Sequence, residues 1–147
     1  MPQNDTYIWL LPTKPSTLLP ITGDIKKTAG LWVRRILENP QKSLGKYAGV
    51  ITEVLSFDEI LKAWSHGTGK PAVVVECTDS SFNDLWGVSA EEFKLQLKFH
   101  ELVPDMIGAF NNKGGNGVYV SGEELGITAE DIGDLTQLFE TLKGNWD

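Results

Sequence analysis

The clearest hydrophobic pattern in the chain lies between Tyr47 and Trp64. Apolar and β-branched residues dominate Tyr47–Val54 and predict a buried strand. A helix follows directly, because apolar residues then recur at helical spacing on one face, at Phe57, Ile60, Leu61 and Trp64. Ser56 and Glu59 have the spacing of a capping box, in which each side chain accepts a backbone N–H of the other residue. The segment therefore predicts a strand that runs straight into a helix.

The same periodicity predicts a helix nearer the start of the chain. Asp24 is placed to cap it, and Asn39-Pro40 ends it after Glu38. The apolar positions of this helix form one stripe: Ile25, Ala29, Trp32, Val33, Ile36 and Leu37. Such a stripe is typical of a helix that packs one face on a core.

A longer helix is predicted in the second half. Ser89 and Glu92 make a second capping-box pattern that opens the helix at Ala90. Pro104 must kink or split this helix, because proline lacks the backbone N–H and clashes with the preceding turn.

Short apolar segments complete the pattern. The predicted strands, besides Tyr47–Val54, are 7–11 and 72–77, with further extended pieces at 18–21 and 118–120. A last helical region begins at Thr128. We therefore expect one α/β (α+β) domain over residues 1–147, with a small mixed sheet of three to four short strands and four to five helices.

The order of these elements resembles the second half of the NmrA-like family, atypical relatives of the short-chain dehydrogenases. The shared pattern is a strand ending in Glu, a Ser or Thr cap, an amphipathic helix and a Gly-Lys turn, here Glu53, Ser56, 57–65 and Gly69-Lys70. Other segments that resemble the family are the Asp-led helix 24–38, the long helix and Gly-rich turn 90–117, and a short final helix at 134–142. The resemblance implies the fold of that family's C-terminal, substrate-binding domain.

The resemblance does not extend to a nucleotide-binding half. The family's Gly-rich loop and its N-terminal Rossmann fold have no counterpart in this sequence. The segment 67–70, GTGK, fails the phosphate-loop pattern, because Trp64 and Pro71 stand where Gly and Ser or Thr are required. The glycines of 114–117 lack the GxGxxG spacing. We therefore expect no cofactor and, without CxxC or HExxH motifs, no metal.

Composition narrows the classes of partner. The net charge of −7 argues against nucleic-acid binding, which depends on Lys and Arg neutralising phosphates. No apolar run approaches the roughly 20 residues needed to span a membrane. Met1 is followed by polar residues, which do not resemble a secretory leader. The single Cys77 suits a reducing compartment, so we expect a cytoplasmic location.

Four titratable residues are candidates for acid–base catalysis. His100 lies on the long helix. It is either a general acid or base, since an imidazole exchanges protons near neutral pH, or an ordinary helix histidine. Glu53 shares a face with apolar residues, so it is either a general acid or is paired with Lys, Arg or a backbone N–H. His66 ends a predicted helix, where it also fits the helix dipole. Asp105 follows the helix-breaking proline and is either catalytic or the start of a new helix.

Aromatic residues suggest a ligand. The chain has five tryptophans, which are hard to bury completely in a domain of this size. Trp9 and Trp86, which adjoin predicted loops, together with Tyr7 and Phe93, are candidates to line a pocket for a flat or prenyl-bearing molecule. Ordinary core and interface packing is the alternative.

Three functional hypotheses follow. The first is a cofactor-independent enzyme of fungal secondary metabolism that performs a redox-neutral acid–base step on an apolar aromatic or prenylated substrate. The steps considered are ring closure (for example intramolecular hydroalkoxylation), isomerisation and dehydration. Each of them needs a correctly placed proton donor or acceptor and a shaped cavity. The second is a non-catalytic NmrA-like module that binds ligands or partner proteins. The third is a subunit that completes a separate Rossmann partner. The tryptophans and histidines favour the enzyme.

Self-association is also expected. In the resembled family this region packs against the Rossmann domain, so its absence would leave apolar surface bare. A twofold homodimer covers such surface most simply. We expect its interface to contain Tyr7–Leu11 or the long helix.

Overall fold

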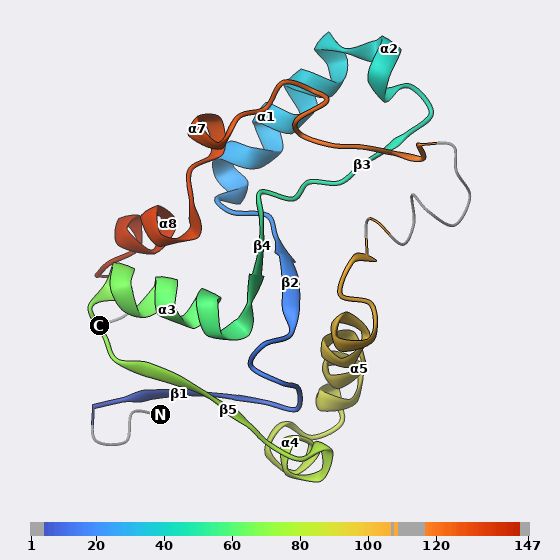
Figure 1. Cartoon of the computed structure of the whole chain (residues 1–147). Helices are drawn as coiled ribbons and strands as arrows, with labels where there is room; N and C mark the ends of the chain where they lie inside the picture. Colours follow the sequence, from blue (N-terminus) through green and yellow to red (C-terminus); the bar gives the residue numbers. More distant parts are fainter. Residues whose placement is uncertain (1–4, 107, 109–116, 145–147) are drawn as a thin grey trace.

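The fold follows from a computed structural model that describes residues 5–106, 108 and 117–144. Helices and strands alternate along the chain, which confirms the predicted α/β (α+β) class. Figure 1 shows helix α5 (Ser89–Leu102) along one side of the molecule, with α3 (Phe57–Thr68) on the opposite side.

The strands pair as three small sheets of two strands each. Strand β1 (Tyr7–Leu11) runs parallel to β5 (Ala72–Glu76), with Trp9 opposite Val74. Strand β2 (Leu18–Ile21) is antiparallel to β4 (Glu53–Ser56). The third pair is parallel and joins β3 (Tyr47–Ala48) to β6 (Tyr119–Val120).

The predicted continuous strand Tyr47–Val54 was wrong, because the structure divides it into β3 and β4. The break follows from hydrogen bonds made by Ile51 and Thr52, the residues that link β3 to β4. Both the backbone N–H and the hydroxyl of Thr52 donate to the carbonyl oxygen of Ile21, at 2.7 and 2.9 Å. Ile51 N donates to Gly49 O at 2.8 Å, which turns the chain sharply. Each half of the segment can then pair with a different strand.

Helix starts in the first half agree with the sequence, although α3 extends to Thr68, beyond the predicted end at Ser65. Helix α1 (Ile25–Glu38) begins after Asp24, whose carboxylate accepts the N–H of Lys26 at 3.1 Å. The capping box of Ser56 and Glu59 is confirmed at the start of α3, which ends at Gly69 in the left-handed region (φ 75°). A further short helix, α2 (Pro40–Ser43), follows α1, because a proline at the first helical position loses no hydrogen bond.

The second predicted capping box was wrong. Helix α4 (Asp79–Trp86) ends at Gly87, and Val88 already has helical dihedral angles (φ −60°, ψ −35°). Val88 therefore occupies the cap position of α5, and no side-chain cap bond forms there. Helix α5 ends at Leu102, two residues before Pro104, as the proline predicts.

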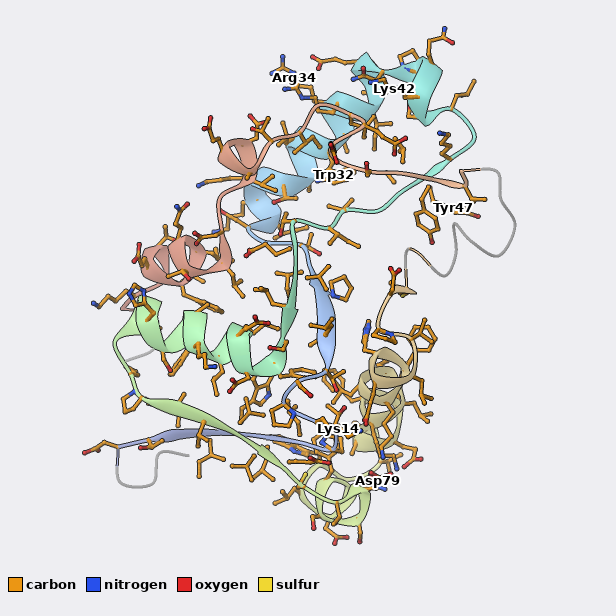
Figure 2. The ribbon with its side chains drawn as sticks, in the orientation of Figure 1. Lys14, Trp32, Arg34, Lys42, Tyr47 and Asp79 are labelled. Atoms are coloured by element: carbon orange, nitrogen blue, oxygen red, sulfur yellow. The ribbon has the colours of Figure 1, made fainter. Side chains whose placement is uncertain are left out.

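Two small cores hold these elements together. The first consists of Leu11, Phe57, Val74 and Leu97, which brings α5 onto the β1–β5 pair and α3. The second is built around Trp32, which Figure 2 shows on α1, together with Val120, Leu125 and Ile127. The chain ends in α7 (Ala129–Ile132) and α8 (Leu135–Thr141).

The apolar stripe predicted on α1 is only partly buried. Trp32 is buried and Ile36 is half-buried, but Ile25, Val33 and Leu37 are exposed. The buried residues of α1 are Thr28 and Trp32. The face of the helix that packs inward is therefore centred on these two residues and not on the apolar stripe.

Candidate functional site

A hollow lined by charged and apolar side chains lies between β4, α3 and the start of α8. Its volume is about 370 Å³, and it is lined by Glu53, Leu55, Glu59, Lys62, Ala63, His66, Asp134, Leu135 and Thr136. Two of the candidate catalytic residues, Glu53 and His66, therefore face the same space. Neither His100 nor Asp105 lines it.

Glu53 holds the start of helix α8. Its Oε1 accepts the backbone N–H of Leu135, the first residue of α8, at 2.9 Å. The first N–H groups of a helix have no partner within the helix, and a carboxylate there also matches the positive end of the dipole. Of the alternatives that the sequence left open, the structure shows Glu53 bound to a backbone N–H.

The other two carboxylates of the hollow also cap helices. Glu59 accepts the hydroxyl and the backbone N–H of Ser56, at 2.7 and 2.8 Å. These hydrogen bonds hold the pKa of Glu59 below its ordinary value. Asp134 accepts the N–H of Gln137 at 2.8 Å, at the start of α8. The carboxylates of the hollow are thus engaged in local structure.

Lys62 and His66 are the basic residues that line the hollow. Lys62 donates to Asp58 at 2.5 Å, and this hydrogen bond raises its pKa. His66 is exposed in the last turn of α3, where a cation is favoured by the helix dipole. His66 is the lining residue whose side chain is best placed to exchange a proton with a bound molecule.

The remaining two catalytic candidates lie at the C-terminal end of α5. The half-buried His100 has its ring 5.9 Å from that of Phe99, in an edge arrangement. Asp105 is exposed and accepts the N–H of Gly108 at 2.8 Å. The structure therefore separates these two residues from the hollow that contains Glu53 and His66.

The four aromatic candidates are spread over the molecule. Trp9 packs edge-on against Phe57 in the first core, with ring centroids 5.2 Å apart. Tyr7 makes a similar contact with Trp64, at 5.1 Å. Trp86 and Phe93 are exposed on α4 and α5. None of the four lines the hollow.

A second hollow, of about 210 Å³, lies between the start of α1 and helices α7 and α8. It too is lined largely by charged and polar side chains, among them Asp24, Lys27, Glu130 and Asp131. Within the described residues, no group of three or more His, Cys, Asp or Glu side chains is arranged to hold a metal ion. Nor does any described helix have the length and apolar character to cross a membrane.

Helix α5 has an exposed apolar surface whose individual residues the sequence did not distinguish. Val88, Leu95, Phe99 and Leu102 are all exposed on the outer side of α5. Their spacing of seven, four and three residues places them on one face of the helix. The long helix was one of the two interfaces expected from the sequence, but these four residues were not distinguished there.

Comparison with known proteins decides the family. The model of the NmrA-like family matches residues 1–136, most of the chain. The chain belongs to the NmrA-like family. Neither the comparison with curated proteins nor that with solved structures found a match. The family places this NmrA-like chain among redox-related or regulatory ligand-binding modules.

Proposed function

We propose that this NmrA-like chain is a non-catalytic regulatory module that acts by binding protein. The observation that carries the proposal is the apolar surface of two helices. Large apolar side chains are exposed on the outer sides of both α1 and α5, among them Leu37, Leu95 and Leu102. Clusters of exposed large apolar side chains are typical of protein-interaction sites.

The chemistry of the hollow supports the same conclusion. A general acid must release its proton to the substrate, but Glu53, Glu59 and Asp134 each have one oxygen that accepts a backbone N–H at the start of a helix. The aromatic side chains that would hold an apolar substrate lie elsewhere. The hollow therefore combines charged groups with the apolar side chains of Leu55, Ala63 and Leu135, and none of the aromatic candidates contributes to it.

The second candidate function is the cofactor-independent enzyme, a ring-closing, isomerising or dehydrating catalyst. The observation that favours it is the shared position of His66 and Glu53 at the hollow. In that function His66 would accept the substrate proton, with Glu53 supporting the fold of the site. His100 and Asp105 would require a second site at the end of α5.

An assay for isomeric products separates the two candidates. The chain is incubated with prenylated phenols, without and with NADPH, and the products are analysed by mass spectrometry. Three proteins are compared: the unaltered chain, His66→Gln at the hollow and the matched control His100→Gln outside it. We expect no product with any of them, and no saturable change in tryptophan fluorescence on titration with NADPH. A product formed by the unaltered chain and lost in His66→Gln would overturn the proposal and establish the enzyme.

A further inference from the structure

Helix α5 is apolar on two opposite sides. Its inner side carries the buried residues Ala90 and Leu97, and Leu97 belongs to the first core. Each residue advances a helix by about 100°, so positions 88, 95, 99 and 102 fall together on the opposite side. The exposed fractions there are 95% for Val88, 61% for Leu95, 43% for Phe99 and 80% for Leu102. We call these four residues the α5 stripe.

The inner side of α5 is firmly attached, so the helix cannot turn to bury the stripe. The Glu101 carboxylate forms an ion pair with Lys14 Nζ at 2.8 Å and accepts a hydrogen bond from the Thr13 hydroxyl at 3.0 Å. Lys98 binds Asp79 of α4, also at 2.8 Å. Figure 2 labels Lys14 and Asp79, which contact the C-terminal half of α5. A helix that is apolar on both sides is normally covered on both.

We propose that the α5 stripe is the interface of a homodimer, in which α5 packs antiparallel against α5 of a second copy. This inference deepens the proposed function as a protein-binding module and rests on it. The spacing of the stripe is that of a helix–helix seam, with Val88, Leu95 and Leu102 seven residues apart and Phe99 between them. The 14 residues of α5 give a seam about 21 Å long.

A second copy fits the stripe because the stripe is complementary to itself. With a twofold axis at Leu95, Val88 of one copy lies opposite Leu102 of the other, and the two Leu95 side chains meet. Glu91 and Lys98 lie seven residues apart on the same flank and are both partly exposed. The antiparallel arrangement brings Glu91 near Lys98 of the second copy, in addition to the partners that the two side chains have within their own chain, Lys94 and Asp79. Antiparallel helix dipoles also attract.

Exposed residues of α4 extend the seam. Leu85 and Trp86 are exposed where α4 meets α5. A specific interface buries about 1,200–2,000 Å² in total, more than one short seam provides, so these side chains complete the area. Tryptophan is also among the residues that most often dominate interface energetics.

Sedimentation equilibrium on two matched variants tests the inference. Leu95→Glu places a charge at the centre of the stripe, and Leu37→Glu makes the same change on α1, where Leu37 is 74% exposed. Circular dichroism establishes that both variants are folded. We expect a dimer for the unaltered chain and for Leu37→Glu. For Leu95→Glu we expect the dimer dissociation constant to rise by about 100-fold or more, as for loss of an interface hot spot.

Two other outcomes would overturn the α5 homodimer, and they show whether the proposed protein-binding function fails with it. A dimer that Leu37→Glu dissociates and Leu95→Glu does not would place the interface on α1; it would refute the α5 seam and leave the protein-binding module intact. An unaltered chain that stays monomeric at several hundred micromolar would refute the homodimer. The product assay with His66→Gln tests the proposed function independently of both results.

Discussion

At the scale of single residues, the two Ser-x-x-Glu patterns show what decides a helix cap. The pattern at Ser56 forms the box, because Ser56 has extended dihedral angles (φ −72°, ψ 159°) that leave its hydroxyl facing the first turn. The pattern at Ser89 does not, because Val88 is already helical and Ser89 lies inside the helix. The sequence predicts the residue types of a cap. The cap forms only where the serine itself stands just before the helix in an extended conformation, as Ser56 does and Ser89 does not.

This difference gives a matched pair of substitutions. Ser56→Ala removes the hydroxyl that accepts the N–H of Glu59, and it should lower the free energy of unfolding by about 1 kcal/mol. Ser89→Ala removes no cap bond and introduces a better helix former, so it should leave stability unchanged or slightly raised. Urea denaturation of both variants measures the two effects. Equal destabilisation would contradict the assignment of the caps.

At the scale of elements, the sequence predicted helices and strands alike where the pattern is local: β1 and β2 have their predicted bounds, whereas the segment 47–54 does not. Helical periodicity is local, so α1 and α3 were placed correctly from residues within each helix. The division of 47–54 depends on Ile21, some 31 residues earlier in the chain, whose carbonyl binds Thr52. The role of Glu53 depends likewise on Leu135, at a separation of 82 residues. No local pattern contains such partners.

The bond between Glu53 and Leu135 predicts how the two substitutions of this glutamate differ. Glu53→Ala leaves the first N–H of α8 without its acceptor and should destabilise the α8 region by about 1 kcal/mol. Glu53→Gln keeps an oxygen in the same place and should have a smaller effect. Hydrogen exchange of the α8 amides measures both. Unchanged exchange in Glu53→Ala would show that the bond does not hold α8.

The direction of the proposed α5 pairing can be tested with introduced cysteines in a Cys77→Ser background. If the helices are antiparallel about Leu95, a Val88→Cys chain should form disulfides with a Leu102→Cys chain and not with itself. Nonreducing electrophoresis of single and mixed proteins gives the result. Self-linked Val88→Cys would show that the helices are parallel.

At the scale of the whole molecule, the family, the class and the presence of bare apolar surface were predictable, but the residues that form this surface were not. Family resemblance rests on the order of elements, which the sequence contains directly. Whether an apolar helix face is covered depends on the remainder of the fold. Helix α5 has apolar residues on two faces, but only the face with Leu97 packs against the rest of the described structure. The arrangement of the strands in three separate pairs also depends on contacts distant in sequence.

Acid should destabilise the folded chain through its hydrogen-bonded carboxylates. Hydrogen bonds from Lys14 and Thr13 hold the pKa of Glu101 below its ordinary value of 4.5, and those from Ser56 lower the pKa of Glu59. A lowered folded-state pKa means that the unfolded chain binds protons first as the pH falls. The stabilisation is therefore complete above pH 4.5 and is lost as the pH falls through the lower folded values. Thermal unfolding between pH 7 and pH 3 should show this loss begin near pH 4.5; a constant melting temperature would contradict it.

The central claim is that this NmrA-like chain works through protein association without a nucleotide. Sedimentation equilibrium of the unaltered chain, over a range of concentrations and with and without NADPH, tests it most directly. The account predicts a reversible dimer whose dissociation constant is the same in both conditions. A monomer at every concentration, or a dimer whose stability changes with NADPH, would contradict it.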